Sequence, residues 1–104
     1  MALNTIEFEC KSASPAQLLK TRQHFGVVGS GDLEVLMEPA DLGGGVTVKI
    51  VTPVSGFDEL WHRVFGKFIE TSNLGDVRVE INDNNATPAV VMLRLQQTLT
   101  QATS

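Results

Sequence analysis

The chain contains one cysteine, no tyrosine and one tryptophan among its 104 residues. A single cysteine excludes a disulfide bond within the chain. No apolar run approaches the roughly 20 residues that a membrane-spanning helix needs. The first residues, Met1 to Asn4, do not show a basic segment followed by an apolar stretch, as a secretory signal would. We therefore expect no membrane partner and a cytoplasmic location.

Basic residues are also few. Eight basic side chains stand against twelve acidic ones, which gives a formal net charge of −4. This excess of negative charge argues against a nucleic-acid backbone as the main partner. It is compatible with docking onto a basic protein surface, and equally with good solubility alone. The charge thus excludes a class of partners and leaves a protein partner open.

Apolar residues, in contrast, are numerous enough for one core. They make up 42% of the chain, which is ordinary for a folded globular protein. A chain of this length suits one small domain. No internal repeat, low-complexity tract or long linker divides it. We therefore expect a single domain over residues 1–104.

Apolar and polar residues alternate in four segments, as they do in strands with one buried face. These segments are residues 5–11, 32–38, 46–50 and 77–82. Pro39 ends the second segment, and three successive glycines at 43–45 precede the third. The second and third segments are therefore predicted to pair as an antiparallel hairpin with a loop of about six residues.

Two main helices are predicted between and after these strands. The first carries one apolar stripe, with Ser55 as its candidate cap. Thr87 and Pro88 are typical of a helix start, and that second helix should run to about Thr100. A short helix from Ser14 to about Arg22 is also possible by the same signals. The apolar stripe of the first main helix consists of Leu60, Trp61, Val64, Phe65 and Phe68.

The apolar faces of these strands and helices must cover each other. The predicted fold class is therefore α+β, a two-layer sandwich of a four-stranded, mostly antiparallel sheet with two main helices packed on one face. If segments 46–50 and 77–82 share the sheet, their connection through a helix should be a right-handed crossover. The sequence does not establish the strand order.

The most unusual segment is Gly26-Val27-Val28-Gly29-Ser30-Gly31. Glycines leave the backbone unshielded, so the Ser30 hydroxyl between Gly29 and Gly31 should be accessible to a modifying enzyme. A simple turn or bulge before a strand is the alternative. The glycine order does not match a phosphate-binding loop, and no helix follows as a hydrolase nucleophile requires.

Other chemistry-bearing residues offer weaker candidates. A serine esterase would need Ser30 beside His24 or His62, and His62 is more simply a partly exposed histidine beside Trp61. Asp32 and Glu34 lie on one strand face, where they form either an acid–base pair or a solvated face opposite Lys49.

Metal-ligating residues do not cluster in the sequence. Cys10 lies on the apolar face of the first segment and is expected in the core. Trp61, Phe65 and Phe68 share one helical face and should be core as well. We therefore predict no metal site.

The segment from Val27 to Leu36 resembles the signature of the acyl carrier subunit, or delta subunit, of malonate decarboxylases. The likeness continues through residues 37–39, returns at 86–91 and 93–97, and fits the strand pattern between them. Residues 11–23 are the least familiar part. Asn85 stands where the family leads us to expect glycine, and asparagine tolerates the left-handed conformation well.

The resemblance implies an acyl carrier and no catalytic residue of its own. By this likeness Ser30 carries 2'-(5''-phosphoribosyl)-3'-dephospho-CoA through a phosphodiester, with Gly29 and Gly31 beside it. The thiol of this arm holds acetyl and malonyl groups as thioesters. The implied partners are the acyltransferase and decarboxylase subunits of a malonate decarboxylase and a prosthetic-group transferase. The alternative is an unmodified α+β protein-interaction module.

Overall fold

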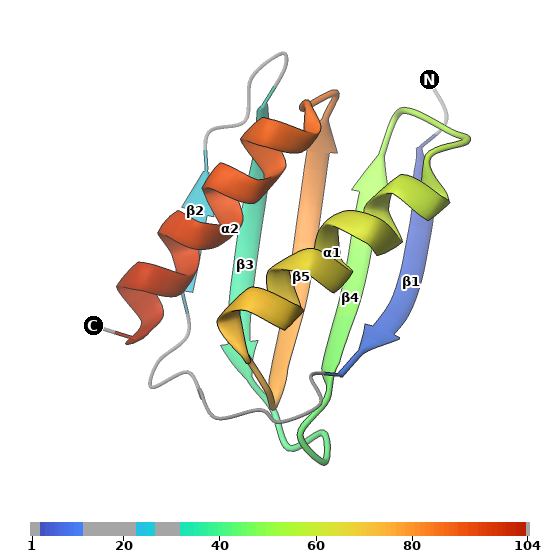
Figure 1. Ribbon diagram of the computed structural model, residues 1–104. Coiled ribbons are helices and arrows are strands. Elements are labelled where there is room, and N and C mark those ends of the chain that lie inside the picture. The colour runs from blue at the N-terminus through green and yellow to red at the C-terminus, as the bar shows by residue number, and fades with distance from the viewer. Residues whose placement is uncertain (1–2, 12–22, 27–31, 104) are drawn as a thin grey trace.

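The computed structural model describes residues 3–11, 23–26 and 32–103. Five strands and two helices follow one another in this part of the chain, and Figure 1 shows both helices in front of the strands. Their bounds are β1 (Asn4–Cys10), β2 (Gln23–Gly26), β3 (Asp32–Pro39), β4 (Val46–Thr52), α1 (Asp58–Ser72), β5 (Val77–Asn84) and α2 (Pro88–Thr103).

The strands form one sheet in the order β1-β4-β5-β3-β2 (Figure 1). β4 and β5 pair in parallel, and the other neighbours pair antiparallel. The predicted α+β class with a mostly antiparallel sheet is therefore confirmed. The prediction counted four strands, whereas the sheet has β2 as a further edge strand. Its four residues are too few to show a clear alternation of apolar and polar side chains.

The predicted hairpin of segments 32–38 and 46–50 is wrong, because β5 lies between β3 and β4. Residues 40–45 must therefore span two strand spacings, about 10 Å, which a connection of this length covers easily. Asp76 holds this connection against the start of β5. Its carboxylate accepts hydrogen bonds from the backbone N–H groups of Leu42 (3.0 Å) and Gly44 (2.7 Å).

The connection from β4 through α1 to β5 has the hand opposite to the expected one. In Figure 1 both strands point up, α1 lies in front of the sheet, and β5 lies to the left of β4, which makes the crossover left-handed. The other side of β4 is occupied by β1, from Asn4 opposite Thr52 to Cys10 opposite Val46. Because β1 takes that edge, β5 pairs with the remaining one.

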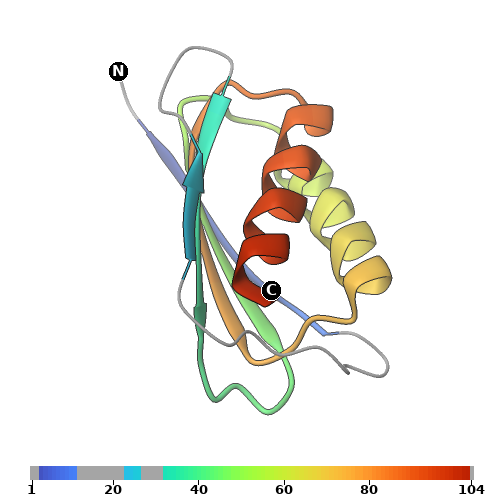
Figure 2. The same cartoon turned by 90° about the vertical axis from the view of Figure 1, so that its left-hand side faces the viewer.

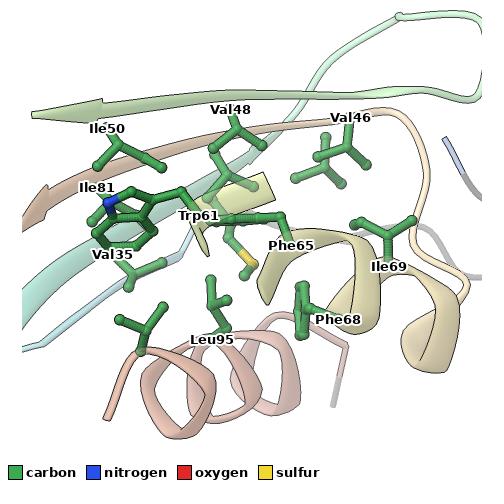
Figure 3. Close-up of a cluster of buried hydrophobic side chains, with 14 of the residues drawn as sticks. Val35, Val46, Val48, Ile50, Trp61, Phe65, Phe68, Ile69, Ile81 and Leu95 are labelled. Atoms are coloured by element: carbon green, nitrogen blue, oxygen red, sulfur yellow. The ribbon is translucent and has the colours of Figure 1, made fainter. Parts of the chain in front are cut away.

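Both helices cover the same face of the sheet, as predicted, and in the described part of the chain no helix covers the other face (Figure 2). The core fills the space between the two layers. Figure 3 shows strand residues such as Val35 and Val48 facing helix residues such as Phe65 and Leu95. Phe65 and Leu95 are fully buried, so the apolar stripe predicted for the first main helix packs on the sheet, and α2 also packs there through an apolar side chain.

The helix starts differ in how well they were predicted. α1 begins at Asp58 after Phe57, so Ser55 is not its cap. α2 begins at Pro88 as expected, where the Thr87 hydroxyl accepts a hydrogen bond from the Val90 N–H (3.3 Å), and it continues to Thr103. The short helix predicted within residues 14–22 lies outside the described residues. Neither described helix has the length and apolar content to cross a membrane.

Candidate functional site

The predicted attachment residue Ser30 and its neighbours Gly29 and Gly31 lie outside the described residues. The structure describes the chain on both sides of them. β2 ends at Gly26, which pairs with Glu34, and β3 begins at Asp32, which pairs with Asn84. The end of β2 and the start of β3 therefore lie at the end of the sheet where β4 and β5 finish and both helices begin (Figure 1). We call this the helix-start end of the sheet.

Asp32 is anchored to α2 by a two-pronged contact with Arg94. The guanidinium donates from Nε to Oδ1 (3.1 Å) and from Nη2 to Oδ2 (2.8 Å). The backbone N–H of Leu33 adds a hydrogen bond to Oδ1 (2.8 Å), and Arg94 also donates to Gln97 (3.1 Å). Such a planar pairing restrains orientation as well as distance. The first residue after the glycine–serine segment thus has a defined position relative to α2.

These contacts lower the pKa of the Asp32 carboxyl group. The largest cause is the hydrogen bonding from the Arg94 side chain, followed by the Leu33 backbone N–H. The same contact raises the pKa of Arg94. Because donors and positive charge favour its ionised form, Asp32 is suited to an ion pair and poorly suited to accepting a proton as a base.

Asp32 and Glu34 do not form an acid–base pair in the structure. Glu34 accepts a hydrogen bond from Asn82 of β5 (3.1 Å), whereas Asp32 is held by α2. Neither lies opposite Lys49, which is in register with Glu7 and Glu80. The predicted pairing with Lys49 fails because it depended on the hairpin, and β5 lies between the two strands.

His62 gives no support to a hydrolytic site. His62 is exposed, as expected, and its ring stacks on Phe8 of β1 at a centroid distance of 4.0 Å. β1 lies three strand positions from β3, which corresponds to about 14 Å across the sheet. His62 is therefore far from the strand that follows Ser30. His24 lies on β2, at its pairing position opposite Leu36.

Cys10 packs at the edge of the hydrophobic core. Cys10 is partly buried against the core, and burial raises the pKa of its thiol. Its unreactive surroundings fit the core role expected for it. Within the described residues, no three His, Cys, Asp or Glu side chains gather closely enough to hold a metal ion.

A buried carboxylate links two strands and the turn before α2 at the helix-start end of the sheet. Asp83 of β5 accepts a hydrogen bond from the Thr52 hydroxyl at the end of β4 (2.8 Å) and another from the backbone N–H of Ala86 (2.9 Å). The Thr52 hydroxyl in turn accepts one from the Val54 N–H (3.1 Å). Asp83 thereby positions the turn that leads from β5 into α2.

A pocket of about 160 Å³ lies beside this carboxylate, between the first turns of α1 and α2. Most of its walls are apolar, and Trp61, the single tryptophan, is one of them. The lining residues are Thr52, Val54, Phe57, Leu60, Trp61, Val64, Asp83, Asn85, Ala86, Pro88 and Val91.

Comparison with known proteins identifies the family. The sequence model of the family described as malonate decarboxylase delta subunit matches residues 20–102. The chain belongs to this family. The resemblance seen in the sequence is therefore confirmed.

Relatives and a solved structure agree with membership of the delta subunit family. The malonate decarboxylase acyl carrier protein of Malonomonas rubra is 50% identical over 102 residues, which cover 98% of this chain and 91% of the relative. That of Pseudomonas aeruginosa strain PAO1 is 41% identical over 100 residues, 96% and 97% of the two chains. A chain in the crystal structure of a Pseudomonas malonate decarboxylase hetero-tetramer in complex with malonate superposes with a TM-score of 0.83 at 34% identity, covering 95% of this chain and 98% of that one.

In this delta subunit, the sequence indicated the conformation of Asn85 but not the role of Arg94. Asn85 adopts the left-handed conformation (φ 68°), which fits the expectation of glycine at this position. Arg94 was not singled out, because a charged residue next to Leu95 in a helix indicates no particular partner. The Asp32 carboxylate lies 62 positions earlier in the chain, and only the fold brings the two together.

Proposed function

We propose that this chain is the acyl carrier subunit of a malonate decarboxylase, and that it carries its acyl groups on an arm attached to Ser30. The observation that carries the proposal is the near full-length similarity to malonate decarboxylase acyl carrier proteins, at 50% identity to that of Malonomonas rubra. The proposed arm is 2'-(5''-phosphoribosyl)-3'-dephospho-CoA, with Gly29 and Gly31 as its immediate neighbours. One carrier domain over residues 1–104 belongs to the same proposal.

The described chain that follows Ser30 fits an attachment of this kind. Leu33 is fully buried, whereas Asp32 is partly exposed, so the described chain leaves the core before it reaches the serine. Arg94 and the pairing with β5 hold Asp32 in place. An arm attached next to this fixed residue would carry its acyl group without disturbing the core.

The division of labour follows from the chemistry. When bound, the arm supplies a thiol that forms acyl thioesters, whose carbonyl accepts the negative charge that develops as carbon dioxide leaves. The chain itself then contributes an attachment hydroxyl, a rigid support and surfaces for its partners. Donors that stabilise the developing charge would belong to a partner subunit. This division makes the chain a carrier and no enzyme by itself.

The partners we propose are the acyltransferase and decarboxylase subunits and a prosthetic-group transferase. Support comes from the solved relative, which is described as part of a malonate decarboxylase hetero-tetramer. Attachment to one carrier raises the effective concentration of an acyl group at successive sites. A cytoplasmic location belongs to the same proposal.

Intact-mass spectrometry tests the attachment. The chain is co-expressed with the modifying enzymes of its own host, as wild type, as Ser30→Ala and as Ser55→Ala. Ser55 lies in an exposed connection and serves as the matched serine control. We expect the wild type and Ser55→Ala to carry the mass of the arm and Ser30→Ala to have the bare mass while remaining folded.

An unmodified wild-type chain would contradict the proposal and favour a protein-interaction module without a prosthetic group. An adduct that persists on Ser30→Ala would place the attachment at another residue. Circular dichroism of all three proteins distinguishes loss of the adduct from loss of the fold.

A further inference from the structure

The apolar pocket between α1 and α2 is formed by residues 52–91, all of which come after Ser30 in the chain. It lies at the helix-start end of the sheet, the same end at which β2 and β3 flank Ser30. Asn85 lines the pocket, and it directly follows Asn84, the residue paired with Asp32. Since neighbouring strands are about 4.8 Å apart, the pocket and the start of β3 lie on the order of 10 Å from each other. The coenzyme A part of the arm is longer than this separation.

The size of the pocket limits what it can hold. Its volume of about 160 Å³ is well below the roughly 300 Å³ at which pockets for larger ligands begin. An apolar cavity of about 150 Å³ holds a benzene molecule, which has six heavy atoms. The acetyl thioester end of the arm, counted as acetyl, sulfur and the next two methylene carbons, has the same number. A short acyl end fits, whereas the whole arm does not.

The chemistry of the walls favours a neutral occupant. Eight of the eleven lining side chains are apolar, and no lysine, arginine or histidine is among these described residues. The Asp83 carboxylate lies on the polar side, with one hydrogen bond already made to each oxygen. Burying a second carboxylate here would leave an unpaired charge among apolar groups and beside a like charge.

The helix starts at the pocket do not reverse this preference. The N-terminus of a helix favours negative charge. The first turn of α1, however, already carries Asp58 and Glu59, whose carboxylates supply that charge. The first turn of α2 carries no acidic residue, but Thr87 accepts hydrogen bonds from two of its backbone N–H groups, that of Val90 on its hydroxyl and that of Val91 on its carbonyl. The pocket is therefore better suited to a neutral acetyl group than to a malonyl group, which carries a free carboxylate.

We propose that this pocket shelters the acetyl thioester of the loaded carrier and excludes the malonyl thioester. The inference rests on the proposed function, since it needs an arm on Ser30. It makes the acetyl form the protected state of the carrier. The malonyl group stays outside the pocket, where a decarboxylating partner can bind it.

Protection from a small nucleophile tests the pocket. The modified chain is acetylated on its thiol with acetic anhydride, or malonylated by exchange with a malonyl thiophenyl ester. Hydroxylamine then attacks the thioester carbonyl, which gives the hydroxamate and frees the thiol for quantification. Each rate is divided by that of the same thioester on free coenzyme A, which removes the difference in intrinsic reactivity.

We expect the acetyl group on the wild-type carrier to react about tenfold more slowly than on coenzyme A, as occupancy of about 90% requires. The malonyl group should show no such protection. Trp61 gives a second signal, because it is the only tryptophan and lines the pocket. Its fluorescence should change on acetylation and return to that of the free-thiol form after hydroxylamine treatment.

Two matched variants separate the pocket from the rest of the surface. Ala86→Leu places a larger side chain at the pocket wall and should abolish the protection. Ala89→Leu makes the same replacement at an exposed position of α2 outside the pocket, and should keep it. Thermal unfolding of both variants checks that the fold is retained. The comparison of acetyl with malonyl on the wild type needs no variant.

The outcomes distinguish this inference from the proposed function. If no arm is found on the chain, both are overturned. If the arm is present but its acetyl thioester reacts as fast as that on free coenzyme A, only the pocket is overturned. Equal protection of acetyl and malonyl groups would overturn the proposed selectivity. Protection that survives in a folded Ala86→Leu variant would show that the acetyl group is sheltered elsewhere.

Discussion

Asp32 is the described residue closest in sequence to the proposed attachment serine. Its carboxylate is held by the Arg94 guanidinium and by the Leu33 backbone N–H, so the start of β3 is tied to α2. Both side chains of the pair are about one-fifth exposed, so water screens the interaction in part. The contact therefore serves mainly to orient the chain next to the attachment segment.

Replacing Arg94 by leucine should raise the pKa of Asp32 toward its ordinary value, because the largest cause of its depression is removed. A carboxyl-detected NMR titration of the variant and the wild type measures this shift. Arg63→Leu is the matched control, since Arg63 pairs with Glu59 on an exposed face of α1. An Asp32 titration that is identical in wild type and Arg94→Leu would show that the ion pair does not form in solution.

At the scale of single elements, a buried side-chain hydrogen bond links the ends of β4 and β5, in addition to their backbone pairing. Thr52 is fully buried, and its hydroxyl is 2.8 Å from Oδ2 of Asp83. Asp83 also accepts a hydrogen bond from the Ala86 backbone N–H, so fixing its carboxylate helps to position the start of α2. A buried acceptor that loses its donor is costly, because water does not replace the lost partner.

Thr52→Val should therefore lower the free energy of unfolding by about 1–3 kcal/mol, the usual cost of leaving a buried polar group unsatisfied. Thr98→Val is the control, because Thr98 is equally buried but its hydroxyl donates to the Arg94 carbonyl one turn earlier in its own helix. Urea unfolding of both variants provides the comparison. Equal decreases in the free energy of unfolding would mean that the hydrogen bond between Thr52 and Asp83 contributes no more to stability than the one within α2.

At the scale of the whole molecule, two carboxylates make the free energy of unfolding depend on pH. The pKa of Asp32 is lowered by Arg94, and that of Asp76 by hydrogen bonds from the Gly44 and Leu42 backbone N–H groups. Both groups thus stay ionised in the folded chain at pH values where they bind protons in the unfolded chain. Their stabilising contribution is present above the ordinary carboxyl pKa and is lost as pH falls through the lowered values.

The free energy of unfolding should accordingly decrease as pH falls below the ordinary carboxyl range, and Asp76→Asn should make this decrease shallower. Asparagine suits the site, because residue 76 has a positive φ of 55° and an amide oxygen can still accept hydrogen bonds. Urea titrations at a series of pH values measure both slopes. Identical slopes for the two proteins would contradict the role assigned to Asp76.

Most of the layered architecture follows from the sequence by itself. Alternation along residues 32–38, 46–50 and 77–82 predicted strands with one buried face, and the stripe containing Phe65 predicted the buried side of α1. These patterns are local, since the spacing of apolar residues along one segment is enough to decide which face is buried. The resemblance around Ser30 likewise used contiguous residues, and it correctly indicated the family.

Tertiary structure alone decided which segments are neighbours. Whether β3 pairs with β4 or with β5 depends on which packing buries all apolar faces together, and the glycine-rich connection after Pro39 permits either arrangement. The left-handed crossover depends on β1 lying beside β4, and the Asp32–Arg94 pair and the pocket beside Asp83 likewise depend on which segments are neighbours. Each involves residues far apart in the chain. The spacing of apolar residues along one segment does not indicate which distant residues will meet.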